Sequence, residues 1–380
     1  MSRNLYSEEH EIFRNAFRKF VEKELTPHYE EWEEQGQFPR SAWKKMGEQG
    51  FLCPWLEEEY GGSGADFLYS VIINEELARA WNHAPVYLHA DIVAPYIYHH
   101  GTEEQKKKWL PGCTTGDTLL AVGMTEPGAG SDLQAIRTTA VKDGDSYVIN
   151  GQKVFITNGI SADLVVLVCK TDPHAKPAHA GISLIGVEAE TPGFIKARNL
   201  KKMGCHISDT AELFFEDCRV PLSNLIGQEG QGFTYLMERL QEERLLVALV
   251  AQTLAEYMLD LTIKYCKERE AFGQPIGQFQ HNTFKIVEMA TEVELGRTFV
   301  NDLILDYMEG KDITKRVSMA KWWIPEMINR VAYHCVQLHG GYGYMEEYEI
   351  CKAYRDVRVT TIGGGTTEIM KEIIGKLLGF

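Results

Sequence analysis

The stretch KDGDSYVINGQKVFITNG, residues 142–159, decides the fold class because it breaks a long helical pattern. Its β-branched and aromatic residues come in short runs, and Asp-Gly and Asn-Gly pairs supply turn chemistry between them. The segments DLVVLVC (163–169), AGISLIGV (180–187) and TAELFFEDCRV (210–220) have the same character. We therefore predict an antiparallel β domain over residues 119–223.

Helical periodicity lies on both sides of this β domain. On the N-terminal side, HEIFRNAFRKFVEKEL (10–25) repeats apolar residues at three- and four-residue spacing, which is typical of an amphipathic helix. The sequence thus predicts an α+β multidomain protein with a helical domain over 1–118 and a helical bundle over 224–380. Within the bundle, long helical stretches are predicted at roughly 231–268, 279–309, 312–339 and 367–378.

Composition and charge exclude several classes of protein. With 380 residues, 44% hydrophobic and 24% charged, the chain has the composition of an ordinary globular protein. Asp and Glu outnumber Lys and Arg by 54 to 39, and the formal charge of -15 repels nucleic acid and anionic membranes. The N-terminus has neither a signal core nor the composition of a transit peptide, and we expect no apolar stretch of membrane-spanning length. We expect a cytoplasmic protein without nucleic-acid or membrane partners.

The cysteines and histidines do not indicate a metal site. Eight cysteines are scattered without a CxxC pair, which predicts buried or surface thiols and neither a zinc site nor a disulfide framework. The His99-His100 pair, His206 and His281 lack metal-ligand spacing with a carboxylate. We therefore predict no bound metal.

Three glycine-rich segments are candidates for ligand binding: MTEPGAGSD (124–132), QLHGGYGYMEEY (337–348) and TTIGGGTTEIM (360–370). None fits GxGxxG between a strand and a helix, which disfavours a Rossmann dinucleotide site. The first segment offers N–H groups and hydroxyls that suit a flavin edge or a phosphate, although a simple turn also explains it. The second lets backbone approach a ligand closely, and a helix stop explains it equally well.

Five motifs, in the same order over nearly the whole chain, resemble those of the acyl-CoA dehydrogenase family. They are MTEPGAGSD, NGQKVFITNG (150–159), KEREAFGQPIGQFQ (267–280), QLHGGYGYMEEY and RDVRVTTIGGGTTEIM (355–370). The resemblance implies an N-terminal helical domain, a middle β-barrel and a C-terminal four-helix bundle, with FAD between barrel and bundle. It also implies a homotetramer built as a dimer of dimers and a role in fatty acid β-oxidation.

The resemblance assigns FAD contacts to three groups of residues. In the β domain, the isoalloxazine and ribityl contacts implied are Met124, Thr125, Gly130, Ser131, Phe155 and Thr157. The adenine-diphosphate contacts, implied to come from a neighbouring subunit, are Arg269, Phe272, Gln280, Gln337, Gly340 and Gly341. Thr366 and Glu368, at the start of the last helix, complete the set. Hydroxyls and N–H groups can polarise a flavin, and the fork of an arginine fits a diphosphate. The alternative for Arg269 is a surface ion pair with Glu268 or Glu270.

The residue that most members of the family use as catalytic base is missing. Most members carry a glutamate in the last glycine-rich loop, at the position that matches Gly364. Long-chain and isovaleryl members carry it on a bundle helix just before an arginine, and here MERLQEERLLVALVAQ (237–252) places Glu243 before Arg244. The resemblance therefore implies Glu243 and Gly364 as catalytic residues. It also implies substrate contacts at Ser131, Arg244, Gly363 and Gly364.

Glu243 also stands out from periodicity alone. It fills the one gap in an apolar helical stripe formed by Leu236, Leu240, Val247, Val250, Leu254 and Met258. Glu238 and Glu242 are predicted to lie off this stripe. Burial should raise the pKa of Glu243 towards the range useful for a general base, although Arg244 opposes this. The alternative is a solvated carboxylate near the start of the helix.

The reaction implied by the resemblance is α,β-dehydrogenation of an acyl-CoA thioester to a trans-2-enoyl-CoA. Glu243 removes the pro-R α-proton while the β-hydride passes to flavin N5. The developing enolate oxygen needs donors, which the N–H of Gly364 and the flavin 2'-hydroxyl supply. The sequence has no iron-sulphur or haem ligands, so the implied electron acceptor is an electron-transferring flavoprotein.

Two other functions and the substrate stay open from the sequence. A flavin-dependent acyl-CoA oxidase is one alternative, and a non-catalytic flavin- or CoA-binding assembly protein of the same fold is another. The position of the carboxylate and motifs such as GGYGYMEEY favour a long acyl chain. Gly363 could instead make room for branched or cyclic acyl groups.

Overall fold

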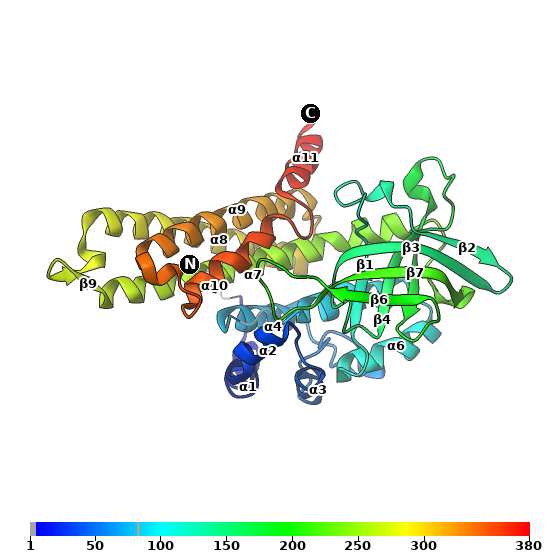
Figure 1. Cartoon of the computed structure of the whole chain (residues 1–380), viewed down its shortest axis with the longest axis horizontal. Coiled ribbons are helices and arrows are strands. Elements are labelled where there is room, and N and C mark those ends of the chain that lie inside the picture. The colour runs from blue at the N-terminus through cyan, green and yellow to red at the C-terminus, as the bar shows by residue number, and fades with distance from the viewer. Residues whose placement is uncertain (1–4, 82–83) are drawn as a thin grey trace.

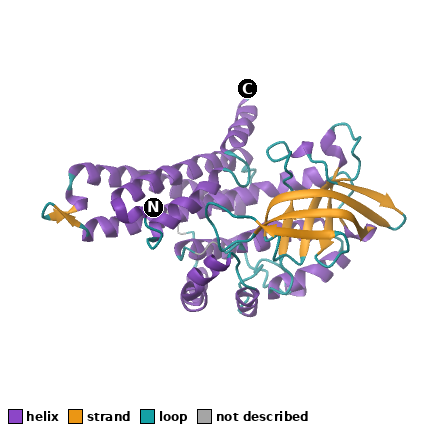
Figure 2. Cartoon of the chain, in the orientation of Figure 1, coloured by secondary structure: helices purple, strands orange, loops and turns teal. Residues whose placement is uncertain are grey.

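The computed structural model describes residues 5–81 and 84–380 and shows three consecutive domains (Figure 1). Figure 2 shows the large sheet towards one end of the long axis, a short two-stranded hairpin at the other end, and helices over the rest of the molecule. Side-chain caps define several helix starts in the N-terminal domain, as where Ser7 and Thr102 each form a capping box. Its helices are α1 (Glu8–Phe20), α2 (Tyr29–Gln35), α3 (Arg40–Glu48), α4 (Phe67–Arg79), α5 (Ala94–His100) and α6 (Glu103–Thr115).

The middle domain is one mixed sheet. Its strands are β1 (Leu120–Gly123), β2 (Thr139–Asp143), β3 (Ser146–Thr157), β4 (Leu164–Lys170), β5 (Ile182–Glu188), β6 (Phe194–Asn199), β7 (Thr210–Pro221) and β8 (Leu225–Ile226). The hydrogen-bonded order is β6-β7-β3-β2-β4-β5-β8, with β1 beside β4. Most pairs are antiparallel, but β1 and β2 both run parallel to β4, so the prediction of an all-antiparallel domain is wrong at these two pairs. Each parallel pair is separated along the chain by a long connection, which a run of hairpins would not contain.

The C-terminal domain contains three long helices and two shorter ones. They are α7 (Gly232–Glu268), α8 (Gln280–Met308), α9 (Thr314–His339), α10 (Glu349–Asp356) and α11 (Thr367–Leu378). A small hairpin of β9 (Glu270–Ala271) and β10 (Gln274–Pro275) joins α7 to α8. The four predicted helical stretches are confirmed, each within two residues at both ends.

Two details of this domain differ from the sequence-based predictions. Helix α10 was not predicted from the sequence, and its eight residues pack against α9 and α7. The last helix, α11, stands out from the body of the molecule (Figure 1), so α10 and not α11 lies along the long helices. The projecting end of α11 exposes the apolar residues Leu377, Leu378 and Phe380.

Helix α7 connects the three domains. Near its start, Leu236 lies in a buried cluster with residues of the N-terminal helices and of the sheet. Further along, the buried residues from Leu245 to Leu259 form the bundle core together with Leu68 and Val71 of α4. Residues 237–244 therefore lie where the three domains meet.

The same helix corrects an expectation about membranes. One 18-residue window of α7 is long and apolar enough to cross a bilayer, so the prediction that no stretch reaches this length is wrong. Most of that window is buried inside the protein, where it packs against α4, α8 and α9. A core helix of a globular domain has the same composition.

Candidate active site

Glu243 lies at the junction of the three domains with an enclosed carboxyl group. Its Oε2 is buried and has no hydrogen-bond partner among residues 5–81 and 84–380. Burial raises the pKa of this carboxyl, and the positive charges of Arg244 and Lys321 oppose the rise only in part. The alternative of a solvated carboxylate is therefore wrong, and the expected direction of the pKa shift is confirmed.

The glycine loop before α11 reaches Glu243. Gly364 has a φ of +67°, in the left-handed region that favours glycine. A Cβ atom placed on it would lie 3.3 Å from Oε1 of Glu243 and 3.5 Å from Cγ2 of Val247. The structure therefore brings together the two residues predicted to be catalytic. At Gly363, by contrast, the nearest neighbour of such a Cβ would be the carbonyl oxygen of Val359 at 3.8 Å.

Lys321, on α9, is a third charged residue at this place, and the sequence analysis missed it. Its Nζ donates to the carbonyl oxygens of Thr360 and Gly365, both at 2.8 Å, and its side chain is fully buried. Burial lowers the pKa of Lys321 to about 8, with Glu243 opposing and Arg244 assisting the shift. The signal was available, because Lys321 interrupts an apolar face of its helix as Glu243 does.

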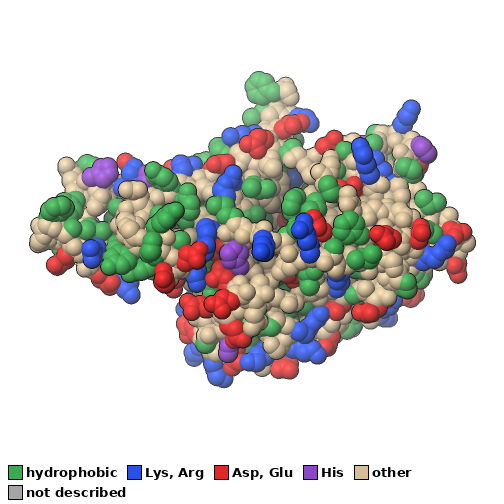
Figure 3. Space-filling model, in the orientation of Figure 1, with side chains coloured by type: hydrophobic (Ala, Val, Ile, Leu, Met, Phe, Trp, Pro, Cys, Tyr) green, Lys and Arg blue, Asp and Glu red, His purple; other side chains and the backbone are tan. Residues whose placement is uncertain are grey.

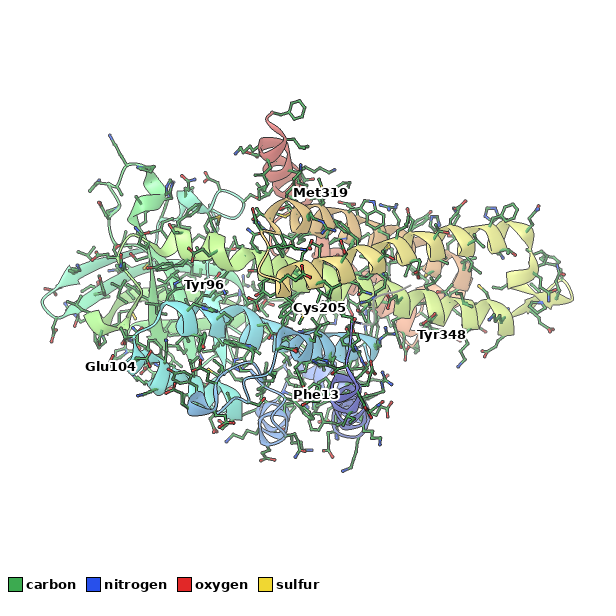
Figure 4. The ribbon with its side chains drawn as sticks, turned by 180° about the vertical axis from the view of Figure 1, so that it is seen from behind. Phe13, Tyr96, Glu104, Cys205, Met319 and Tyr348 are labelled. Carbon is green, nitrogen blue, oxygen red and sulfur yellow. The ribbon has the colours of Figure 1, made fainter. Side chains whose placement is uncertain are left out.

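Two further polar groups near Glu243 lack partners. Arg244 is buried and its Nε has no hydrogen-bond acceptor, and burial lowers the pKa of its guanidinium. The hydroxyl of Tyr96 is also buried without a partner, and burial together with the charge of Glu243 raises its pKa. Tyr96, labelled in Figure 4, belongs to α5, which packs against α7. Unsatisfied buried groups are uncommon in folded proteins, and they concentrate here around one carboxylate.

The side chain of Glu242 is more buried than predicted. It was predicted to lie off the buried stripe, yet only 14% of its side chain is exposed, against 51% for Glu238. Burial raises the pKa of Glu242 to about 7, although a hydrogen bond with Tyr307 opposes the rise. The prediction assumed that α7 has one buried face. In the structure the helix is covered on several sides, because it lies between domains.

The residues assigned to the isoalloxazine lie together on the sheet. Lys153 Nζ donates to the carbonyl of Met124 and to Glu126, at 2.9 and 2.8 Å, and the N–H of Val154 donates to the carbonyl of Thr125. These bonds fasten the glycine-rich loop to β3. Phe155, with its side chain 67% exposed, and Thr157 follow on the same strand. A Cβ on Gly130 would meet no protein atom within 4 Å, so packing within the chain does not explain this glycine.

The residues assigned to the adenine-diphosphate lie at the far end of the bundle. Here the end of α7 meets the end of α9, where the rings of Tyr265 and His339 stack at 4.2 Å. Arg269 is exposed and its Cζ lies 5.7 Å from the ring of Tyr342. The alternative ion pair of Arg269 with Glu268 or Glu270 does not form among the described residues, which leave its charge unpaired. The remaining assigned residues, all exposed, are Phe272, Gln280, Gln337, Gly340 and Gly341.

These two groups lie at opposite ends of one chain. Figure 1 shows β9, which follows Arg269, at one end of the long axis and β3, with Phe155, towards the other. Thr366, whose side chain caps α11, and the exposed Glu368 lie between them near Gly364. One chain therefore does not bring the two groups together around a single ligand.

The far end of the bundle is also rich in exposed apolar side chains. Figure 3 shows hydrophobic side chains gathered over the end of the molecule that carries β9. Exposed residues of this region include Phe272, Phe284, Val287, Tyr333, Tyr342 and Tyr344. Apolar patches on this scale are typical of surfaces that another protein chain covers.

Comparisons with known proteins cover nearly the whole chain. Family models for the N-terminal, middle and C-terminal domains of acyl-CoA dehydrogenase match residues 7–117, 121–218 and 230–379. The chain is 49% identical over 377 residues to the long-chain specific acyl-CoA dehydrogenase, mitochondrial, of Mus musculus, which covers 98% of this chain and 87% of that protein. It is 39% identical over 376 residues to the caffeyl-CoA reductase-Etf complex subunit CarC of Acetobacterium woodii, covering 98% and 99%.

A solved structure agrees with the sequence comparisons. The crystal structure of an acyl-CoA dehydrogenase from Geobacillus kaustophilus is 60% identical to this chain and superposes with a TM-score of 0.99. The match covers 100% of both chains.

Proposed function

The chain belongs to the acyl-CoA dehydrogenase family and has acyl-CoA dehydrogenase activity, and we propose that Glu243 is the base that removes the α-proton of its thioester substrate. The observation that carries this proposal is the enclosed carboxyl of Glu243 beside Gly364. A glutamate base needs a pKa raised towards neutrality, and burial raises that of Glu243. A glutamate is not needed at position 364, because Glu243 on α7 supplies the carboxyl group.

Each residue of the site has a defined part in this proposal. The α C–H bond breaks, its proton goes to Glu243, and the electron pair forms the new α,β double bond as the β-hydride leaves. The thioester oxygen gains negative charge during this step, and the N–H of Gly364 is the backbone donor proposed to stabilise it. The left-handed conformation at position 364 favours glycine, which has no side chain to occupy the space that the thioester would use.

The residues on the sheet and near α11 fit a bound FAD, which supplies the acceptor for the hydride. Thr125, Ser131 and Thr157 offer hydroxyls, Phe155 offers an exposed aromatic face, and Gly130 leaves room for a ligand. Thr366 and Glu368 lie at the N-terminus of α11, where N–H groups favour an oxygen ligand. Met124 contributes through the loop that Lys153 fastens to β3.

We further propose that a second copy of the chain completes each FAD site. The unpaired Arg269 suits a diphosphate, but it lies at the opposite end of the chain from Phe155. Two chains packed in opposite directions would bring one chain's Arg269, Gln280 and Gln337 to the other's sheet. The exposed apolar residues around β9 support such an interface, and a tetramer made of two such dimers is the assembly that we expect.

Two finer points rest on relatives. The name of the long-chain specific enzyme of Mus musculus supports a long acyl-CoA as the substrate. The name of CarC, a subunit of an Etf complex, supports an electron-transferring flavoprotein as the acceptor of electrons. Both points belong to the proposal.

The test compares Glu243→Gln with Glu242→Gln, its neighbour on the same helix. Both substitutions replace a buried carboxyl whose pKa is raised, but only Glu243 faces Gly364. We expect Glu243→Gln to bind FAD and acyl-CoA and to lower the rate of anaerobic flavin reduction by about 10²- to 10⁴-fold or more. Glu242→Gln should reduce its flavin at close to the wild-type rate.

The measurement is stopped-flow bleaching of the flavin by a long-chain acyl-CoA without oxygen. Near-wild-type bleaching in Glu243→Gln would show that the base lies elsewhere. Absence of bleaching in the wild type, with FAD and acyl-CoA bound, would point to a binding protein. Peroxide formation at the turnover rate in air would identify an oxidase.

A further inference from the structure

Lys321 forms a bridge between α9 and the glycine loop. It lies on the buried side of α9, among Val317, Ile324 and Ile328, which are fully buried. Two of its three N–H donors bind carbonyls at the two ends of the loop, at Thr360 and at Gly365. Gly364, where an added Cβ would lie 3.3 Å from Oε1 of Glu243, lies between these two carbonyls in the chain. The side chain therefore fixes the loop from both ends.

Lys321 is also a buried cation without an ion pair. Among the described residues no carboxylate oxygen lies within 4.0 Å of its Nζ, although burying an ammonium is costly. Lys153 on β3, which is also buried, has such a partner in Glu126 at 2.8 Å. The carboxylate that interacts most strongly with Lys321 through its charge is that of Glu243.

The groups that face Glu243 come from four parts of the chain. Lys321 on α9 and Arg244 on α7 carry positive charge, while Tyr96 on α5 and Tyr87, just before the π-helical segment η4 (Leu88–Val93), carry phenols. Burial and the charge of Glu243 raise the pKa of both phenols, so these stay neutral. Of these four groups, the two cations carry a charge that favours an ionised Glu243, and Lys321 is the one that also holds the loop.

We propose that Lys321 is a positioning residue of the reaction, which holds the Gly364 loop in place and keeps Glu243 ionised at the pH where it accepts the proton. This inference rests on the proposed role of Glu243 as the base. Hydrogen bonds to both loop carbonyls orient the peptide that presents the Gly364 N–H to the thioester oxygen. The ammonium charge opposes the rise in the pKa of Glu243 that burial causes.

Removing the charge should therefore move the pH dependence of the reaction. In Lys321→Met, the pKa of Glu243 rises further, so the rising limb of the pH–rate profile moves to higher pH. We expect a displacement of about one pH unit, the lower end of the range for a carboxyl that loses an opposite charge nearby. Lys321→Arg keeps the charge and should keep the limb near its wild-type position. The profiles are measured below about pH 8, where Lys321 itself stays charged.

A matched control distinguishes the loss of charge near Glu243 from the loss of hydrogen bonds between a lysine and backbone carbonyls. Lys196 on β6 also donates to two backbone carbonyls, those of Ile160 and Ala162, but it lies in the sheet away from Glu243. Lys196→Met should leave the pH–rate profile in place. Where Lys321→Met does not fold, Lys321→Gln, which keeps a donor and loses the charge, replaces it and should show the same displacement.

A second readout does not depend on flavin reduction. Infrared difference spectra of the holoprotein follow the protonated carboxyl band through a pH titration, with Glu243→Gln and Glu242→Gln used to assign the two buried glutamates. In Lys321→Met the titration of Glu243 should move to higher pH. That of Glu242, whose pKa reflects burial, Tyr307, Asp91 and Arg239, should not move.

The outcomes separate this inference from the proposed function. The first outcome is that Glu243→Gln loses flavin reduction, while Lys321→Met changes neither the pH–rate limb nor the titration of Glu243. This result would overturn the role of Lys321 and leave Glu243 assigned as the base. A displaced limb and a displaced titration, both restored by Lys321→Arg, would support it. Retained reduction in Glu243→Gln would overturn the base and this inference together.

Discussion

Two positions on α7 bury charged groups, and they differ in how those groups are paired. Around Glu256, the guanidinium of Arg297 reaches Glu75 at 2.6 Å and both oxygens of Glu256 at 2.5 and 2.9 Å. Arg14 of α1 adds a bond to Glu75 at 2.9 Å. Three turns earlier, Glu243 and Arg244 have no hydrogen-bond partner on Oε2 and Nε. The same helix therefore contributes to one ionic network whose charged groups are paired and to another in which polar atoms lack partners.

The difference distinguishes scaffold from site. Removing one partner of a buried, fully hydrogen-bonded ion pair lowers the stability of the fold, because it leaves an uncompensated charge. Groups that stay unsatisfied destabilise the folded chain and remain available to a ligand. The paired network joins α1, α4, α7 and α8, whereas the unpaired one faces the glycine loop. Each prediction below tests whether this division of α7 is correct.

The largest expected effect is on stability and comes from the paired network. Arg297→Met should lower the free energy of unfolding by about 3–5 kcal/mol, because Glu75 and Glu256 would be left buried without their main partner. The rate of flavin reduction in the protein that stays folded should not change. Urea unfolding followed by circular dichroism, together with stopped-flow bleaching, measures both quantities.

Arg316→Met is the control for this prediction. Arg316 pairs with Asp302 and Asp306, but 38% of its side chain is exposed, so water screens the pair. Its loss should destabilise the protein far less than that of Arg297. Equal effects of the two substitutions, or a slow flavin reduction in Arg297→Met, would contradict the division between scaffold and site.

A third charged position, just beyond α7, extends the comparison to the assembly. Arg269 is unpaired like Arg244, but it is exposed, and we assign it to the neighbour's FAD. Arg269→Ala should weaken FAD binding by about 1.5–3 kcal/mol for each charged hydrogen bond that is lost. FAD fluorescence on dilution measures retention, sedimentation velocity measures the oligomer, and Lys267→Ala is the control. A monomer that holds FAD normally would contradict the shared site.

The two networks should also respond to pH in opposite directions. Burial alone would raise the pKa of Glu75, but Arg297 and Arg14 outweigh it and the net pKa is lowered. Its contribution to stability is therefore present above about pH 4.5 and is lost as the pH falls. The pKa of Glu243 is raised, so its folded form holds a proton that the unfolded form has released, and stability falls as the pH rises through that window.

Unfolding free energies between about pH 3 and pH 7 test these signs. In Arg297→Met the decrease towards acid should be shallower than in the wild type, because Glu75 has lost the charge that lowers its pKa. In Glu243→Gln the stability relative to wild type should improve as the pH rises. A parallel pH dependence in all three proteins would show that neither carboxyl titrates as proposed.

The sequence predicted much of the fold and the key carboxylate because both leave periodic signals. Glu243 interrupts an apolar stripe, and its burial follows from helix geometry. The same reasoning applied to α9 would have found Lys321 between Val317 and Ile324. Glu242 could not be predicted, because its burial depends on how three domains surround α7. The parallel pairs β1–β4 and β2–β4 also arise from long-range contacts that local patterns do not encode.

A smaller effect separates backbone strain from crowding in the loop. Gly364→Ala places a residue with a side chain at φ +67°, which costs about 1–2 kcal/mol, and its Cβ would lie 3.3 Å from Glu243. Gly144→Ala, at φ +63° with no atom within 4 Å, carries the same strain without the contact. Both variants should lose similar stability in urea, but only Gly364→Ala should slow flavin reduction. Equal reduction rates would show that Gly364 does not face the reacting thioester.

The smallest expected effect is a partial rescue, which asks whether the unpaired network can supply its carboxylate from the other side. In Glu243→Gln, adding Gly364→Glu places a carboxyl on the loop, from a Cβ position 3.3 Å from where Oε1 of Glu243 lies. The new group can therefore approach the same α-carbon while the backbone N–H still faces the thioester oxygen. Recovery should be incomplete, because the left-handed backbone costs a non-glycine residue about 1–2 kcal/mol, a factor of roughly 5 to 30 in rate if it opposes the reactive conformation. Anaerobic bleaching of the wild type, the two single variants and the double variant measures this. A double variant no faster than Glu243→Gln, with FAD and acyl-CoA still bound, would mean that the loop and α7 do not converge on one reacting atom.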